Sequence, residues 1–104
     1  MNIPKQIKIG AHTYKVAYPY HFKERGDLIH GQIDHPVCEI RVNDVDSSGN
    51  ARNETQVLRT LIHEIIHGVE NAWGLDFDEK TVGALAEGFT AVIIDNGFVR
   101  IPNE

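Results

Sequence analysis

The chain has 104 residues, with 15 acidic against 10 basic side chains and a formal net charge of -5. This length fits one domain, so we take residues 1–104 as a single domain without room for a separate binding module. The acidic balance, with no cluster of Lys and Arg, argues against a nucleic-acid partner. No apolar run approaches a membrane-spanning length and the N-terminus lacks the apolar core of a signal peptide, so we expect no membrane partner and a cytoplasmic location.

The first half of the chain predicts a small antiparallel sheet. Apolar and polar residues alternate on both sides of Gly10, which predicts a hairpin of strands at 5–9 and 12–18. A second alternating stretch predicts a half-buried strand at 38–43, paired with one at 28–33.

The second half predicts two helices. Asn53 and Gln56 have the spacing of a capping box, so the first helix should run from about 54 to 72. A second helix fits 79–95 and contains few charges, which predicts that it is buried on nearly all sides. The expected fold class is α+β, with the sheet packed on the first helix and the second helix buried.

The first helix carries the motif H-E-x-x-H at His63, Glu64 and His67. With about 100° of rotation per residue, both histidines share one face, opposite an apolar core face. The residues of that core face are Leu58, Ile62, Ile65 and Val69, flanked by Leu61 and Ile66. Two imidazoles at i and i+4 can converge on one zinc ion while the glutamate between them reaches a water molecule there. The alternative is a solvated His/Glu face on a surface helix. In either case Glu70 is expected to be a solvated helix residue rather than a ligand.

A catalytic zinc site needs a third protein ligand. The single cysteine, Cys38, excludes a disulfide framework and a multi-cysteine zinc site, so the ligand must be His, Asp or Glu. Glu87 is the one charged residue between Thr81 and Ile94. An unpaired carboxylate in a buried helix would cost several kcal/mol, a penalty that a cation removes. We therefore predict Glu87 as the third metal ligand. Glu79 is the alternative, although the helix dipole also explains a glutamate at a helix start.

The other four histidines are His12, His21, His30 and His35. Each is expected on a strand or loop surface rather than at the metal. His30 or His35 lies near the strand that edges the cleft and is a candidate for stabilising an oxyanion.

The H-E-x-x-H helix followed by a glutamate on the next helix resembles zincin metallopeptidases of the gluzincin type. More closely, the order of sheet and helices is similar to compact phage- and prophage-encoded metallopeptidases related to the ImmA/IrrE and SprT-like groups. ImmA/IrrE proteins usually have Glu-x-x-Ala-Asn on the second helix, whereas this chain has Gly83 near the glutamate position and Glu87 in place of the asparagine. The resemblance implies a minimal zincin fold, zinc as cofactor and a peptide or protein substrate.

The function expected is therefore zinc-dependent hydrolysis of peptide bonds, with His63, His67 and Glu87 holding zinc and Glu64 as general base. A strand around 37–43 at the edge of the sheet would align an extended peptide by backbone pairing. The alternative is that this strand is paired on both sides within the sheet. The alternatives are a catalytically inactive zincin-fold protein that binds metal or regulates a partner, and a scaffold that binds no metal.

Overall fold

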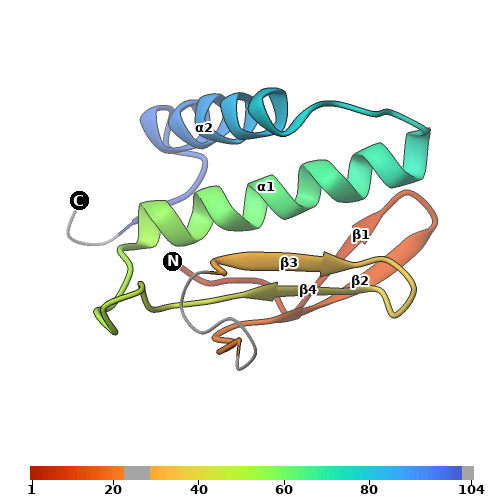
Figure 1. Ribbon diagram of the computed structural model, residues 1–104. Helices are drawn as coiled ribbons and strands as arrows, with labels where there is room; N and C mark the ends of the chain where they lie inside the picture. The colour runs from red at the N-terminus through yellow and green to blue at the C-terminus, as the bar shows by residue number, and fades with distance from the viewer. Residues whose placement is uncertain (23–28, 102–104) are drawn as a thin grey trace.

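The computed structural model describes residues 1–22 and 29–101 and shows an α+β fold of three layers (Figure 1). The strands are β1 (Gln6–Ile9), β2 (His12–Ala17), β3 (Gly31–Asp34) and β4 (Glu39–Val42), and the helices are α1 (Glu54–Trp73) and α2 (Glu79–Asp95). Helix α1 covers one face of the sheet, and α2 lies on the other side of α1. Among the described residues α2 packs on α1 and on no strand.

The sheet is mixed and has the strand order β1-β2-β4-β3. Both predicted hairpins are present, because β1 pairs antiparallel with β2 and β3 pairs antiparallel with β4. The prediction of a wholly antiparallel sheet is wrong, since β2 and β4 run parallel. A long connection between them lets β4 enter the sheet in the same direction as β2. The predicted strand at 28–33 begins at Gly31, and residue 28 lies outside the described residues.

The edge of the sheet is not where the sequence placed it. The strand predicted at 38–43 is β4, and it lies inside the sheet between β2 and β3. The prediction that this strand aligns a peptide at the edge is therefore wrong, because both of its edges are already paired. The two edge strands are β1 and β3, and both contact α1.

Side-chain caps begin both helices, and the cap at Asn53 is the one that the sequence predicted. The Asn53 side chain accepts a hydrogen bond of 2.9 Å from the Gln56 N–H at the start of α1. Helix α1 ends at Gly74, whose φ of 67° is the left-handed conformation that glycine adopts most readily. The Asp78 side chain caps α2 by accepting 2.7 Å from the Thr81 N–H. The sequence at 74–78 is therefore a short linker between two helices that run in opposite directions.

Helix α1 is buried on two sides, toward the sheet and toward α2. Its contacts with the sheet come from Val57 and Leu61, which join a core cluster of Ile9, Tyr14, Val16, Ile40 and Val42. Its contacts with α2 come from Leu58, Ile62 and Ile66, which pack on Val82 and Ala86. The predicted core face is thus buried, but it divides between two separate clusters because α1 is the middle layer.

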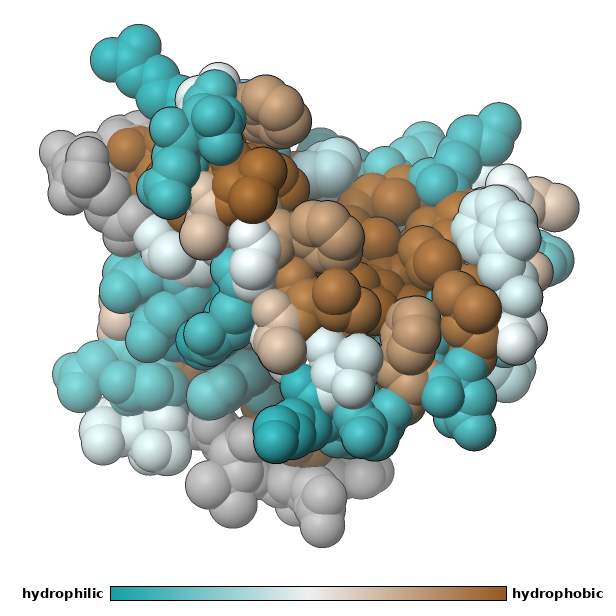
Figure 2. Space-filling model, turned by 90° about the horizontal axis from the view of Figure 1, so that it is seen from above, coloured by the Kyte–Doolittle hydropathy of each residue, from teal (hydrophilic) through white to brown (hydrophobic). Residues whose placement is uncertain are grey.

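Helix α2 is the outer layer, and the prediction that it is buried on nearly all sides is wrong. Only Val82, Ala86 and Thr90 are buried in it. Apolar side chains on its outer side remain in solvent, with Phe89 51% and Val92 52% exposed. Figure 2 shows this apolar surface from above. Neither helix in the described part of the chain is both long and apolar enough to span a membrane.

Candidate metal centre

The two histidines of the H-E-x-x-H motif lie one turn apart on α1, at the side where α2 begins. Their ring centroids are 5.0 Å apart, and both side chains are about one quarter exposed. The i, i+4 spacing of the helix produces this arrangement, because it stacks the two side chains on one face. The predicted convergence of His63 and His67 is confirmed.

Glu79, the first residue of α2, completes a group of three possible metal ligands. Its Oε1 lies 3.0 Å from Nε2 of His67, and its Oε2 lies 3.4 Å from Nε2 of His63. The three ligand atoms lie within 4.8 Å of one another, and no other group of three His, Cys, Asp or Glu residues in the described ranges does so. Two imidazole nitrogens and one carboxylate oxygen form a donor set that fits zinc.

Glu87 does not lie with the histidines, so the prediction that it completes this group is wrong. Its Oε1 accepts a hydrogen bond of 2.8 Å from the Arg59 guanidinium, and its side chain is 65% exposed. The cause is the register of the two antiparallel helices. Glu87 lies eight residues, or about 12 Å, along α2 from Glu79. Arg59 lies eight residues before His67 on α1. Because the two helices are antiparallel, Arg59 lies opposite Glu87, just as His67 lies opposite Glu79.

Glu70 is bound to His67 and to the linker between the helices. Its Oε1 lies 2.7 Å from Nδ1 of His67, and its Oε2 accepts a hydrogen bond of 2.8 Å from the Phe77 N–H. The Phe77 N–H, together with His67, holds the pKa of this carboxyl below its ordinary value. The prediction that Glu70 is solvated is wrong, since its side chain is only 11% exposed. Its i, i+3 spacing from His67 was the signal in the sequence that identifies this contact.

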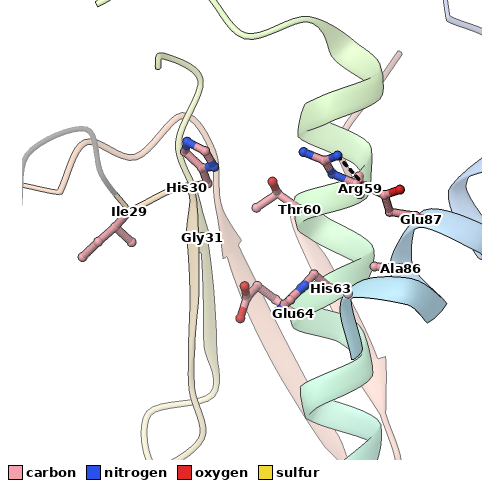
Figure 3. A pocket seen from close by; sticks show the side chains of 10 residues that line it. Ile29, His30, Gly31, Arg59, Thr60, His63, Glu64, Ala86 and Glu87 are labelled. Carbon is pink, nitrogen blue, oxygen red and sulfur yellow. Dashed lines mark hydrogen bonds and ion pairs between the residues drawn. The ribbon is translucent and has the colours of Figure 1, made fainter. Parts of the chain in front are cut away.

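Glu64 is buried between α1 and the edge strand β3, with 8% of its surface exposed. Burial is the main reason that the pKa of its carboxyl is raised to about 7; His67 opposes this shift, and the Glu79 charge adds a smaller increase. The close approach requires glycine at position 31, because a Cβ there would lie 2.5 Å from Cγ2 of Thr60 and 3.2 Å from Oε2 of Glu64. In Figure 3 the Glu64 carboxylate points toward the strand that carries Gly31.

An open cleft of about 570 Å³ runs along α1 between the start of β3 and α2. Glu64 and His63 line it, and Arg59 and Glu87, joined by a dashed line in Figure 3, lie further along it. His30 also lines the cleft. Burial and the nearby Arg52 and Arg59 lower the pKa of His30, which favours the neutral imidazole.

The remaining histidines lie away from the metal group. His35 lies 3.0 Å from the Tyr14 hydroxyl through its Nδ1 and does not line the cleft, so His30 is the better placed of the two oxyanion candidates. His12 and His21 are exposed, as predicted, and His21 pairs with Asp44 at 2.8 Å.

Comparison with protein-family models found none that matches this chain, and comparisons with curated proteins and with solved structures also found no match. The resemblance to zincin metallopeptidases therefore stays a prediction from the motif.

Proposed function

We propose that this protein is a zinc-dependent metallopeptidase whose metal ligands are His63, His67 and Glu79. The observation that carries the proposal is the group of three ligand atoms within 4.8 Å, which joins the start of α2 to the motif on α1. Three protein ligands leave a fourth coordination position open, which distinguishes catalytic zinc sites from structural ones. Glu79 takes the place that we expected for Glu87.

Glu64 would serve as the general base. When bound, zinc polarises a carbonyl group and lowers the pKa of water. A carboxyl with a pKa of about 7 can accept a proton near neutral pH and return it to a leaving amine. A purely structural metal site has no need of such a group beside it. The burial that raises this pKa also holds the carboxylate at the cleft, between α1 and Gly31.

The edge strand β3 would hold the substrate. Its outer edge has no strand partner in the part of the chain that the structure describes, and its first residue, Gly31, lines the cleft beside Glu64. An extended peptide can pair with such an edge through its backbone, which places a peptide bond along the cleft. This supports a peptide or protein as the substrate. His30, at the same end of β3, would face the developing oxyanion.

The exclusion of nucleic acid and membrane as partners still rests on the charge balance and the apolar pattern of the sequence. The cytoplasmic location and the relationship to phage-encoded metallopeptidases likewise stay predictions.

A second candidate is a zincin-fold protein that binds metal and a partner without cleaving it. The exposed apolar side of α2, which includes Phe89 and Val92, favours it, because large exposed apolar surfaces mark binding sites.

One experiment separates the two candidates. Zinc content is measured by elemental analysis for the purified wild type and for Glu64→Gln, and both are assayed against a peptide library. One zinc per chain in both proteins, with cleavage by the wild type alone, supports the peptidase. Zinc without any cleavage would favour the binding protein, and a wild type without zinc would contradict both.

A further inference from the structure

Glu70 lies outside the H-E-x-x-H motif, yet each of its carboxylate oxygens has one specific partner. Oε1 is hydrogen-bonded to Nδ1 of His67 on the same helix, and Oε2 accepts a hydrogen bond from the backbone N–H of Phe77 in the linker. Phe77 stands two residues before Glu79 in the chain. One half-buried carboxylate therefore contacts one candidate ligand directly and fixes the backbone just before another.

We propose that Glu70 is a positioning residue that prepares the metal site before zinc binds, by selecting the tautomer of His67 and docking the linker that carries Glu79. The inference rests on the proposed zinc site. It adds a residue that touches neither metal nor substrate and acts through His67 and Phe77.

The hydrogen bond to Nδ1 decides which nitrogen of His67 is left for a metal. A carboxylate can only accept, so the hydrogen bond to Glu70 requires the proton on Nδ1, and in that tautomer Nε2, which faces Glu79, keeps a free lone pair. Glu79 competes for the opposite tautomer, since it lies 3.0 Å from Nε2. The bond to Glu70 is shorter, at 2.7 Å, and its carboxylate is 11% exposed against 73% for Glu79. The hydrogen bond to Glu70 is the shorter and the less exposed to water of the two, so Glu70 prevails.

The hydrogen bond to Phe77 acts on the second helix. Five linker residues, 74–78, separate the helices, so anchoring Phe77 limits where α2 can begin. The Asp78 cap then starts α2 at Glu79. The anchor and the cap together bring the Glu79 carboxylate to the two imidazoles.

Glu70→Gln separates the tautomer effect from the linker effect. The amide oxygen of Gln can still accept from the Phe77 N–H, while its NH₂ group turns to Nδ1 of His67 and donates. The proton of His67 then moves to Nε2, the nitrogen that should bind zinc. The matched control is Asp78→Asn, which also removes one carboxylate charge near the site but keeps the helix cap, because Asn caps as well as Asp.

Zinc affinity is measured by chelator competition for the wild type and both variants. The His67 tautomer is read from the side-chain ¹⁵N chemical shifts of the metal-free protein. The sample is kept at a pH well above the usual histidine pKa of about 6.5, so that the neutral imidazole is observed. We expect Glu70→Gln to weaken zinc binding by about 10- to 100-fold and Asp78→Asn by less than about threefold. The proton should reside on Nδ1 in the wild type and on Nε2 in Glu70→Gln.

Two results would overturn the proposal: a wild-type His67 that carries its proton on Nε2, or equal zinc affinities for Glu70→Gln and Asp78→Asn. The tautomer of the metal-free wild type needs neither a variant nor zinc. This measurement therefore tests the role of Glu70 separately from the proposed function. It can be made even if the wild type binds no zinc, a result that would contradict the proposed function.

Discussion

The contact between α1 and α2 has a histidine end, formed by His63, His67 and Glu79, and an arginine end, formed by Arg59 and Glu87. At the histidine end a carboxylate faces two imidazoles that can share a cation with it. At the arginine end a carboxylate already has a guanidinium partner. Both glutamates are exposed and face α1. The register of the two antiparallel helices, rather than the isolation of a charge in the sequence, therefore decides which of them meets the two histidines.

The largest expected effect concerns Glu64, which lies beside the histidine end. Glu64→Gln keeps the size of the side chain but cannot accept the proton, so kcat/KM for a cleaved peptide should fall by about 10²- to 10⁴-fold. Zinc content should stay at the wild-type level, because Glu64 is not a ligand. Steady-state kinetics together with elemental analysis measures both. A variant that retains full activity would remove Glu64 from the mechanism.

The second prediction compares the two ends directly. Glu79→Ala should weaken zinc binding by more than about 100-fold, since even the loss of a group that only supports a ligand costs about 10- to 100-fold. Glu87→Ala, its matched control two turns along the same helix, should change zinc affinity by less than about threefold because its charge is exposed and screened. Chelator competition on both variants gives the answer. The reverse order of effects would restore Glu87 as the ligand.

The third prediction uses the pH dependence of the metal-free protein. Burial gives Glu64 a pKa of about 7 in the folded state against 4.5 ordinarily, so the unfolded chain releases this proton first as the pH rises. The free energy of unfolding should fall by about 3 kcal/mol between pH 4.5 and 7 on account of this group. Glu64→Gln has no carboxyl to titrate at this position, so its free energy of unfolding should not fall in this way. Relative to the wild type, the variant should therefore be more stable above pH 7, and this advantage should be much smaller below pH 4.5. Urea unfolding across that range measures the difference, and a difference that does not vary with pH would contradict the assignment.

The smallest effect belongs to the arginine end. The side chains of Arg59 and Glu87 are 39% and 65% exposed, so Arg59→Ala should lower the free energy of unfolding by no more than about 1 kcal/mol. Urea unfolding at neutral pH measures it. A decrease of about 3 kcal/mol or more in the free energy of unfolding is typical of breaking a buried ion pair, and it would contradict the description of the arginine end as an exposed pair.

Most of the fold could be predicted from local signals. The caps at Asn53 and Asp78 and the alternation around Gly10 fix element ends through contacts within a few residues, and the predicted helices and hairpins are present. The parallel pairing of β2 with β4 could not be predicted, because β3 lies between them in the chain and the alternation of residues does not say which strand pairs with the second edge of β4. The position of α2 as the outer layer could not be predicted either. An apolar helix has the same composition whether other elements cover all of its sides or only one.

The site was predictable in part. The i, i+4 spacing of His63 and His67 guarantees that they share a face, and this held. The third residue of the group depends on α2, and the assumption that its lone Glu87 is buried led to the wrong residue. The short linker at 74–78 was the better guide, because it places the start of α2 opposite the last turns of α1, where His67 lies.

Anomalous diffraction from crystals grown with zinc shows whether the start of α2 helps to hold the ion. Data collected above and below the zinc absorption edge locate the ion without reference to any variant. We expect one peak about 2.0–2.2 Å from Nε2 of His63, Nε2 of His67 and a carboxylate oxygen of Glu79. A peak that includes Glu87 in place of Glu79, or no peak at the two histidines, would contradict it.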